Sequence, residues 1–441
     1  MKLKNYAEGR WVEHKGYGFE QYNAITGDLI STASSEGLDY EAMTDYARRI
    51  GGKALRSMTF YERGFMLKKL ALHLDSLKKK YYQISYLSGA TKSDSWVDID
   101  GGIGTLFTYA SLRRQLGNQR FYVDGDTAKI SMNNTFVGQH IMSPKQGVVV
   151  HINAFNFPIW GMLEKLSANL IAGVPAIVKP SEITSYLTQA MVEDIIASGI
   201  VPEGAIQLDC GKGHGILDTL GSQDLVTFTG SAATGRMLKS LPHIIENSIP
   251  FNMEADSLNA AILGEDSAPG TANFDIFIKE VRREMTTKAG QKCTAIRRIM
   301  VPENYLEDVQ IALGKSLALT TIGDPANEKV RMGAIVNKSQ VDVVRNRVLE
   351  MSQKTPIVFG DLDKFEVIGA DANKGFFLPP ILMLNENPLI NTDSHDIECF
   401  GPVSTLMPYT GIEEAITLAK MGKGSLVSTI ATSDVNIATE Y

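Results

Sequence analysis

A cysteine next to a lysine is the residue pair of this sequence best suited to covalent chemistry. Cys293 lies in the segment 290–294, just past a predicted helix end, and Lys292 precedes it directly. An ammonium group nearby lowers the pKa of a thiol, and a bend that contains glycine can leave the sulfur accessible, so Cys293 is a candidate nucleophile. A lone cysteine is more often buried and inert, and this alternative stays open.

Two other side chains could assist a thiol nucleophile. Asn156 lies between a predicted strand and a predicted helix, where an amide either caps the helix or donates a hydrogen bond to a developing oxyanion. Glu254 lies in a segment flanked by apolar residues and is either a general base or a charge at a strand edge. The residue types alone leave both alternatives open.

Two strand ends could bind a nucleotide. Lys179, Ser181 and Glu182 follow a predicted strand directly, which places a cation and a carboxylate at the carboxyl edge of a parallel sheet, where ligands bind. Solvated loop charges are the simpler interpretation of these residues. Gly230 and Ser231 join another strand to a helix, whose first N–H groups can hold a phosphate. A plain turn with a serine cap is an equal alternative there.

The middle third of the chain alternates between short apolar runs and amphipathic helical stretches, which is typical of a parallel α/β sheet. We predict a helical stretch after each of four buried strands, which lie at 147–152, 175–179, 205–209 and 224–230. The first helix follows Pro158 and ends at Gly173, and the second has Ser185 as its cap.

Two further regions complete the predicted organisation. Residues 121–146 are polar, rich in β-branched residues and carry a Gly-Asp turn, which predicts an extended hairpin that projects from the domain. A surface hairpin without a partner is an equal alternative. A second α/β unit begins after residue 255, with one helix whose apolar face runs from Phe274 to Met285 and strands at 297–301 and 425–432.

The composition is that of a globular protein with several compact units. The chain has 441 residues, of which 44% are hydrophobic and 21% charged, and about 150 residues per domain predicts about three units. The net charge of −7 argues against a nucleic-acid partner, because phosphate binding needs concentrated positive charge. Three widely spaced cysteines and no targeting or membrane-spanning run favour the cytoplasm, and the scattered histidines predict no metal site.

Together, these residues and the segment 398–402 closely resemble the aldehyde dehydrogenase superfamily over nearly the entire chain. The resemblance implies an α/β fold with two doubly wound parallel-sheet domains and a projecting β-hairpin arm. The implied parts are a cofactor-binding domain at 1–122 and 145–252, an oligomerisation arm at 123–144 and a catalytic domain at 253–441. Family members continue further, so we expect the catalytic domain to be truncated at its C-terminus.

The resemblance also implies a role for each site residue. Cys293 is the expected nucleophile, Asn156 and the backbone N–H of Cys293 form the expected oxyanion hole, and Glu254 is the expected base. Lys165 matches a family lysine with a proton-relay role. The expected cofactor is NAD or NADP. The resemblance implies that Lys179 and Glu182 contact its adenosine ribose and that Gly230 and Ser231 contact its pyrophosphate. It also implies that Glu398 and Phe400 contact the nicotinamide riboside, and that Ser181 is a further cofactor-binding residue.

The implied activity is NAD(P)-dependent oxidation of an aldehyde to a carboxylic acid through a cysteine thioester. Within the superfamily, the sequence is most similar to dehydrogenases that are joined to an enoyl-CoA-hydratase-like domain in phenylacetate degradation, so a CoA-thioester semialdehyde is the expected substrate. A CoA-acylating dehydrogenase and a non-catalytic nucleotide-binding scaffold on the same fold remain alternatives. We expect a homodimer or higher homo-oligomer, without a nucleic-acid or membrane partner.

Overall fold

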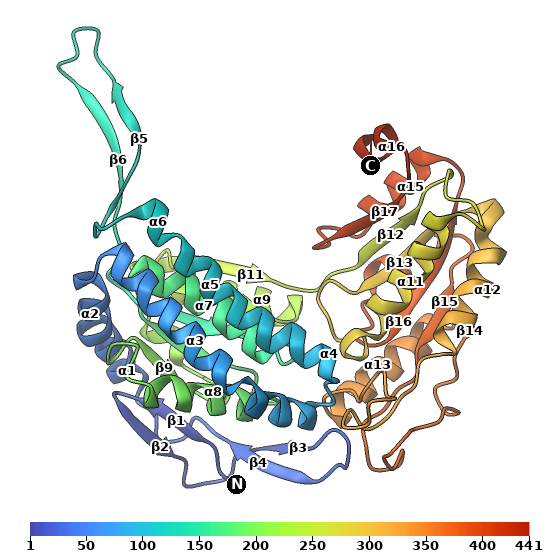
Figure 1. Ribbon diagram of the computed structural model, residues 1–441, viewed down its shortest axis with the longest axis horizontal. Coiled ribbons are helices and arrows are strands. Elements are labelled where there is room, and N and C mark those ends of the chain that lie inside the picture. Colours follow the sequence, from blue (N-terminus) through green and yellow to red (C-terminus); the bar gives the residue numbers. More distant parts are fainter. Residues whose placement is uncertain (441) are drawn as a thin grey trace. The chain divides into compact units, whose positions relative to one another are not determined.

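A computed structural model describes residues 1–440 of the chain, so the expected end of the catalytic domain at Tyr441 lies outside the described residues. The chain divides into two compact units (Figure 1). The first comprises Met1–Gln21, Ile30–Ile84 and Ser95–Ala255, and the second comprises Tyr22–Leu29, Ser85–Asp94 and the chain from Asp256 onward. Two short segments that the resemblance assigns to the cofactor-binding domain therefore belong to the second unit.

The first unit contains a seven-stranded sheet. Its strands are β1 (Lys4–Ala7), β2 (Arg10–Glu13), β7 (Val149–Ile152), β8 (Ala176–Lys179), β9 (Ile206–Leu208), β10 (Leu225–Thr229) and β11 (Phe251–Glu254). Their order is β11-β10-β7-β8-β9-β1-β2. The five strands from β11 to β9 are parallel, whereas β1 and β2 are antiparallel additions at one edge. The four strands predicted in the middle third are confirmed as β7 to β10.

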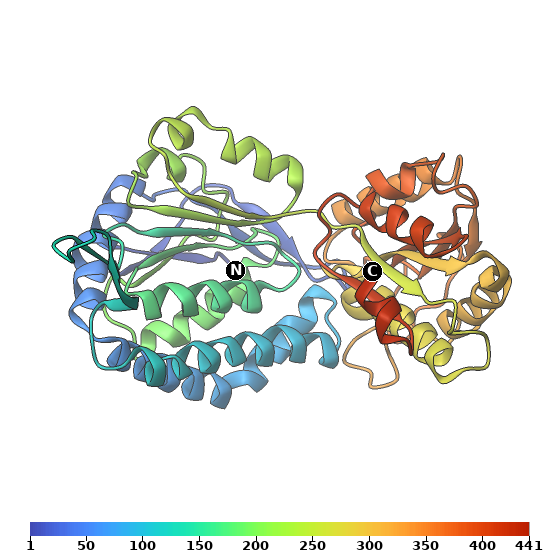
Figure 2. The same cartoon turned by 90° about the horizontal axis from the view of Figure 1, so that it is seen from above.

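Helices cover both faces of this sheet (Figure 2). The helices of the unit are α1 (Tyr40–Tyr46), α2 (Gly52–Ser57), α3 (Phe60–Ser85), α5 (Gly101–Ser111), α6 (Arg113–Leu116), α7 (Pro158–Ala172), α8 (Ser185–Ala197), α9 (Ala232–Lys239) and α10 (Pro242–Glu246), with short turns of other helix types at Ala47–Gly51, Trp96–Asp100 and Ile216–Thr219. Val150, Ile177 and Val226 of the sheet pack into one core with Met43 of α1 and Ile244 of α10. The side chains that alternate with them along each strand point to the opposite face.

Two predictions about the helices of this unit are wrong. Ser185 is the first residue of α8 rather than its cap, and the N-cap Thr184 makes no side-chain capping bond. The predicted helical stretch after β9 is only the single 3₁₀ turn Ile216–Thr219, because Gly213 and Gly215 have positive φ angles of 69° and 90° that interrupt a right-handed helix. The helix after Pro158 is confirmed as α7, and it ends at Gly173 in the left-handed conformation.

The predicted hairpin is also confirmed. It consists of β5 (Tyr122–Lys129) and β6 (Val137–Met142), which pair antiparallel and project from the first unit (Figure 1). Nearly every residue of the two strands is exposed, including the apolar Val137, Ile141 and Met142. A second antiparallel pair, β3 (Phe19–Tyr22) with β4 (Leu29–Ala33), forms a separate small sheet.

The second unit contains a six-stranded sheet. Its strands are β12 (Asn259–Leu263), β13 (Ile296–Pro302), β14 (Ile357–Phe359), β15 (Ile381–Leu384), β16 (Val403–Tyr409) and β17 (Ser428–Ala431). Their order is β14-β15-β16-β13-β12-β17, and all neighbours are parallel except β14 with β15. The strand predicted at 297–301 is confirmed as β13, and the one predicted at 425–432 is confirmed in the shorter β17.

Helices also cover both faces of the second sheet. They are α4 (Lys92–Ser95), which reaches the unit boundary, α11 (Ala272–Thr286), α12 (Leu306–Leu317), α13 (Lys338–Met351), α14 (Asp393–Asp396), α15 (Ile412–Lys420) and α16 (Val435–Glu440). Two 3₁₀ turns lie at Tyr86–Ser88 and Glu303–Tyr305, and the segment Thr287–Gly290 contains a left-handed turn. Ala261 and Leu263 of β12 pack against α11 and α12. Ala260 and Ile262, which alternate with them, pack against α15. The unit is therefore doubly wound, as predicted.

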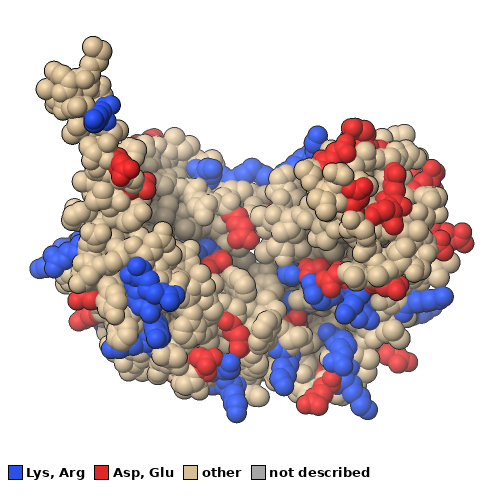
Figure 3. Space-filling model, turned by 45° about the horizontal axis from the view of Figure 1, so that its top comes forward, with Lys and Arg blue, Asp and Glu red and all other residues tan. Residues whose placement is uncertain are grey.

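Two further observations concern the charges on the surface and the length and polarity of the helices. On the face drawn in Figure 3, acidic side chains gather at the upper right, and basic and acidic side chains lie mixed along the lower edge. Among the described residues, every helix is too short or too polar to cross a membrane.

Candidate active site

The candidate nucleophile Cys293 follows a left-handed turn in the second unit. The three residues 288–290 have φ angles of 53°, 51° and 69°. The glycine of this turn is required, because an added Cβ would lie 2.1 Å from the carbonyl oxygen of Gly401. The other two residues adopt a conformation that side chains disfavour, so surrounding contacts must hold them. One such contact is the hydrogen bond from the Lys288 N–H to Asp94, at 2.7 Å.

The peptide groups on both sides of Cys293 are hydrogen-bonded. Asn259 Nδ2 donates to the carbonyl oxygens of Cys293 and Ala295, both at 2.9 Å. Arg297 Nη2 donates to the carbonyl oxygen of Lys292 at 3.3 Å. Cys293 itself is partly exposed, whereas the other two cysteines are buried. Cys293 is therefore not buried, and its backbone is held while the residue stays partly accessible. Its reactivity stays a prediction.

The side chain of Lys292 is engaged by a carboxylate. Its Nζ lies 2.7 Å from Glu284 Oε2 of α11, and both side chains are mostly buried. An ion pair at this distance offsets much of the field of the ammonium group. Activation of the thiol by Lys292 therefore stays a prediction.

Glu398 and Phe400 are held by one arginine in the same unit. Glu398 Oε1 accepts a hydrogen bond from Arg297 Nε at 3.4 Å, and its Oε2 accepts one from the Ser257 N–H at 3.3 Å. Burial raises the pKa of Glu398 above its ordinary value, and the charge of Arg297 opposes this shift. The ring centre of Phe400 lies 5.5 Å from the guanidinium carbon of Arg297. These contacts fix both residues that the resemblance places at the nicotinamide riboside.

In the first unit, Asn156 lies between β7 and α7 and is 6% exposed. Its side chain makes no hydrogen bond with any described residue. The N-terminus of α7 is capped by Asp98 instead, whose Oδ1 accepts hydrogen bonds from the N–H groups of Ile159 (3.1 Å) and Trp160 (2.7 Å). The helix-capping alternative for Asn156 is therefore wrong, and its oxyanion role stays a prediction.

Lys165, Thr229 and Glu254 form a chain of hydrogen bonds. Lys165 Nζ donates to Thr229 Oγ1 at 2.9 Å, and Thr229 Oγ1 donates to Glu254 Oε2 at 3.4 Å. The chain arises because β10 and β11 are parallel neighbours with Thr229 paired to Glu254, while α7 carries Lys165 across the sheet face. A lysine is thus connected to a carboxylate through one hydroxyl, which is an arrangement suited to moving a proton.

Lys179, Ser181 and Glu182 form a compact group at the carboxyl end of β8. Lys179 Nζ donates to the carbonyl oxygen of Pro180 at 3.0 Å and to Glu182 Oε2 at 3.4 Å. Ser181 Oγ accepts a hydrogen bond from the Ile183 N–H at 3.4 Å. Lys179 is only 7% exposed, so it is not a solvated loop charge. A buried cation next to a carboxylate at this edge fits the hydroxyl groups of a ribose.

Gly230 and Ser231 join β10 to α9. Ser231 is the N-cap of α9, and its Oγ accepts a hydrogen bond from the Thr234 N–H at 3.2 Å. The serine-cap alternative is thus confirmed. At Gly230, an added Cβ would lie 2.8 Å from Phe228 Cζ, which explains the glycine by packing within the junction. The pyrophosphate contact at this junction stays a prediction.

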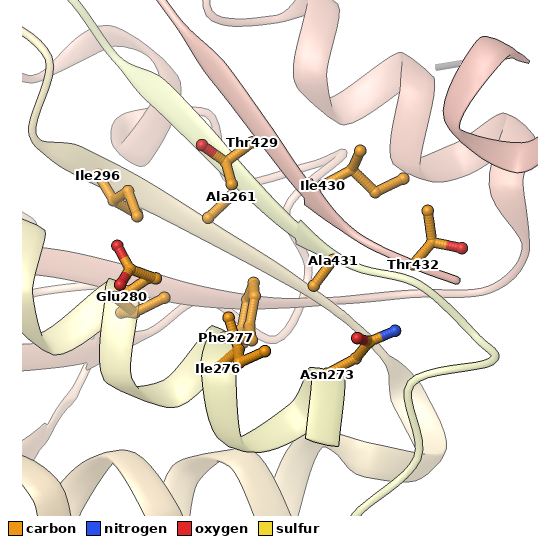
Figure 4. A pocket seen from close by; sticks show the side chains of 11 residues that line it. Ala261, Asn273, Ile276, Phe277, Glu280, Ile296, Thr429, Ile430, Ala431 and Thr432 are labelled. Atoms are coloured by element: carbon orange, nitrogen blue, oxygen red, sulfur yellow. The ribbon is translucent and has the colours of Figure 1, made fainter. Parts of the chain in front are cut away.

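The second unit contains a cavity that none of these residues lines (Figure 4). It has a volume of about 190 Å³, and its walls come from α11, β12, β13 and β17. Phe277 and Ile276 of α11 lie on the side of β17 toward which Ala431 points, whereas the side chain of Ile430 packs against the opposite face of the sheet. Within the described part of the chain, no group of three or more His, Cys, Asp or Glu side chains could hold a metal ion.

Sequence reasoning missed Arg297, Asn259 and Asp98, and it gave Thr229 no role of its own. One signal for Arg297 was present, since it and Arg298 lie inside the otherwise apolar strand predicted at 297–301. A charged side chain in a buried strand needs partners nearby. The other three residues are common types in ordinary positions, and the sequence carried no comparable signal for them.

Comparison with known proteins gives one consistent result. The profile of the aldehyde dehydrogenase family matches residues 11–441. A 3,4-dehydroadipyl-CoA semialdehyde dehydrogenase of Aromatoleum evansii is 40% identical over 435 residues, which cover 98% of this chain and 84% of that protein. A human 2-aminomuconic semialdehyde dehydrogenase is 25% identical over 452 residues, which cover 99% of this chain and 86% of that protein.

Solved structures agree at the level of the fold. An aldehyde dehydrogenase from Bacillus cereus in complex with NAD+ matches with a TM-score of 0.85 at 24% identity, over 100% of this chain and 87% of that chain. A betaine aldehyde dehydrogenase from Staphylococcus aureus, also in complex with NAD+, matches with a TM-score of 0.86 at 22% identity, over 99% of this chain and 84% of that chain. From the match of its sequence and its fold, the chain belongs to the aldehyde dehydrogenase family.

Proposed function

We propose that the protein oxidises a CoA-thioester semialdehyde from aromatic degradation to the carboxylic acid, with NAD or NADP as the oxidant. The substrate class is supported by the relative at 40% identity, which is named for the oxidation of a CoA semialdehyde. The observation that carries the hydrolytic part is the chain from Lys165 through Thr229 to Glu254. The closer likeness to phenylacetate-degradation dehydrogenases stays a prediction.

In the first half-reaction, the thiolate of Cys293 attacks the aldehyde carbon, and the carbonyl oxygen becomes an oxyanion. The backbone N–H of Cys293 and the amide of Asn156 are the proposed donors to this oxyanion. A bound nicotinamide cofactor would supply the oxidant, as the acceptor of the hydride from the tetrahedral carbon that this attack forms. The result on the protein is a thioester at Cys293.

In the second half-reaction, Glu254 takes a proton from water as the water oxygen bonds to the thioester carbon. The C–S bond then breaks, and Cys293 returns to the thiolate. The proton on Glu254 must leave before the next turnover. Thr229 and Lys165 offer it a route through two hydrogen bonds. The same base argues against a CoA-acylating dehydrogenase, because transfer to the thiol of CoA needs no activated water.

The residues at the end of β8 fit the adenosine half of the cofactor. Lys179 can donate to ribose hydroxyls, and Glu182 can accept from them, because the two side chains already lie 3.4 Å apart at the carboxyl edge of the parallel sheet. Gly230 and Ser231 are the proposed pyrophosphate contacts, and Glu398 and Phe400 are the proposed contacts of the nicotinamide riboside.

The hairpin of β5 and β6 supports assembly of the protein into a homo-oligomer. Several of its apolar side chains are exposed, among them Met132, Phe136 and Ile141, and exposed apolar groups on a projecting hairpin favour burial against a second copy. Size-exclusion chromatography with light scattering tests this. A variant with Asp at Phe136 and Ile141 should shift toward the monomer, and an unchanged mass would contradict the proposed role of the arm.

The substrate and the fate of the acyl group can be tested in one experiment. The protein is incubated with an aliphatic aldehyde, an aromatic aldehyde or a CoA-thioester semialdehyde, each with NAD+ or NADP+ and with or without free CoA, and Cys293→Ala serves as the control. We expect reduced cofactor with the CoA-thioester semialdehyde and a free carboxylate by mass spectrometry. Formation of an acyl-CoA from free CoA would favour the acylating alternative. Cofactor binding without any oxidation would favour the scaffold alternative.

A further inference from the structure

Arg297 is a buried arginine on β13, and two of its hydrogen bonds reach the nucleophile loop, which comprises residues 290–294. It is 4% exposed. Its Nη2 donates to the carbonyl oxygens of Gly290 (2.7 Å) and Lys292 (3.3 Å), and its Nη1 donates to that of Gly401 (2.7 Å). Its Nε donates to Glu398 at 3.4 Å. A planar guanidinium with several donors can hold such a set of acceptors in one fixed geometry, which a flexible ammonium cannot.

The bond to Lys292 matters most, because of the geometry of the peptide group. The carbonyl oxygen of Lys292 and the N–H of Cys293 belong to the same peptide bond, which is planar with the two groups on opposite sides. A donor that fixes the direction of the C=O therefore fixes the direction of the N–H as well. A hydrogen bond to the carbonyl also polarises the peptide and makes its N–H a better donor.

We propose that Arg297 is a positioning residue that aims the backbone N–H of Cys293 at the oxyanion formed when the thiolate attacks a carbonyl group. This inference rests on the covalent step of the proposed function. Asn259 completes the arrangement from the other side, since its amide holds the carbonyl oxygen of Cys293 at 2.9 Å. The bonds of Arg297 to Gly401 and Glu398 hold the segment 398–401 at the same guanidinium.

The chain provides its own control in the neighbouring Arg298. This residue lies on the same strand and is equally buried, but it points to the opposite face. Its donors reach the carbonyl oxygens of Leu258 (2.7 Å) and Leu418 (2.6 Å), and its other partners among the described residues, His395 and Ala419, also lie outside the segment 290–294. Replacing either arginine with lysine removes the same planar fork from the same strand. A difference between the two variants therefore reports the contact with the loop.

Two reagents separate a reaction that forms an oxyanion from one that does not. With p-nitrophenyl acetate, the sulfur of Cys293 bonds to the acetyl carbon through a tetrahedral oxyanion, and nitrophenolate leaves. With iodoacetamide, the sulfur bonds to the CH₂ carbon as iodide leaves, and no oxyanion forms. Neither reaction needs the cofactor. Because Cys210 and Cys399 are buried, both reagents report Cys293, which peptide mass spectrometry verifies.

We expect Arg297→Lys to lower the rate constant of acetylation about tenfold or more relative to that of alkylation, which is less than the about 10²–10³ lost when an oxyanion donor is removed. Arg298→Lys should leave this ratio within about twofold of the wild type. An unchanged ratio in Arg297→Lys, or an equal fall in both variants, would overturn the proposal. A wild-type Cys293 that is alkylated but never acetylated would also overturn it.

A second variant covers the case in which Arg297→Lys does not fold. The double variant R297Q/E398Q removes both charges of the buried pair, so no single charge is left without its partner. The same fall in the ratio is expected, and an unchanged ratio would contradict the positioning role. A protein that shows the expected ratios but oxidises no aldehyde would refute the proposed function and leave the role of Arg297 standing.

Discussion

The carboxylate of Glu182 predicts a modest preference for NAD over NADP. If Glu182 faces the adenosine ribose, it accepts from the 2′-hydroxyl of NAD and repels the 2′-phosphate of NADP. Two like charges about 4 Å apart repel by about 1 kcal/mol in water and by about 4 kcal/mol at an effective dielectric constant of 20. The repulsion between Glu182 and a 2′-phosphate is expected to lie between these limits, because the site is only partly exposed to water. The side chain of Glu182 is 24% exposed, and that of the neighbouring Lys179 is 9% exposed.

Lys179 offsets part of the repulsion, since its Nζ lies 3.4 Å from Glu182 and its charge attracts a phosphate equally well. A net penalty of about 1.4 kcal/mol, or about tenfold in kcat/KM, is therefore expected. Glu182→Gln keeps the shape and removes the charge, so it should shift the ratio of kcat/KM toward NADP by about tenfold or more.

The assay is steady-state kinetics with both cofactors on the wild type and the variant. Glu193→Gln is the matched control, because Glu193 lies on α8 and its carboxylate accepts from Gln189 rather than facing the end of β8. This control should leave the cofactor ratio unchanged. A strong NADP preference in the wild type that Glu182→Gln does not alter would show that Glu182 does not face the ribose.

Two further predictions concern the first unit. Asn156→Ala should lower kcat by about 10²–10³ with little change in melting temperature, because it removes a proposed oxyanion donor. Asp98→Ala should lower the free energy of unfolding by about 1 kcal/mol or more, because it removes the cap of α7. Calorimetry and steady-state kinetics on both variants test this, and a loss of kcat in Asp98→Ala with a loss of stability in Asn156→Ala would refute it. Burial, with the charge of Lys165, lowers the pKa of His151 to about 3, so between about pH 6.5 and 3 the unfolded chain binds a proton that the folded unit does not, and stability is lost as the pH falls. His151→Gln should reduce that loss by about 2 kcal/mol at pH 5, and identical pH profiles of the melting temperature would contradict the assignment.

The parts of the fold that local signals determine could be predicted from the sequence. Pro158 begins α7 and Gly173 ends it, because fixed φ angles and left-handed glycines act within a few residues. The edge strand β2 was not predicted, since its residues are half-buried or exposed and form no apolar run. Ser185 failed as a cap because its hydroxyl instead accepts a hydrogen bond at 2.8 Å from Gln21, which is 164 residues away in sequence.

The same distinction holds for the candidate site. The types and order of Cys293, Asn156 and Glu254 carry a signal, because their chemistry lies in the side chains. The hydrogen-bond partners of Arg297 are mostly backbone carbonyl oxygens. Every residue has such an oxygen, so no pattern of residue types in the sequence identifies these partners. The link through Thr229 likewise depends on the register of β10 and β11, which appears only once the strands are paired.

Glu254 is proposed to activate water for attack on a thioester at Cys293, and the variant Glu254→Gln separates this step from the formation of the thioester. Rapid mixing of this variant with aldehyde and cofactor should give a burst of reduced cofactor near one equivalent per active site, because the first half-reaction needs only the thiolate. Turnover should then stall, with an acyl adduct on Cys293 visible by mass spectrometry. Loss of the burst itself would contradict the division of roles, since Glu254 would then be needed before the thioester forms.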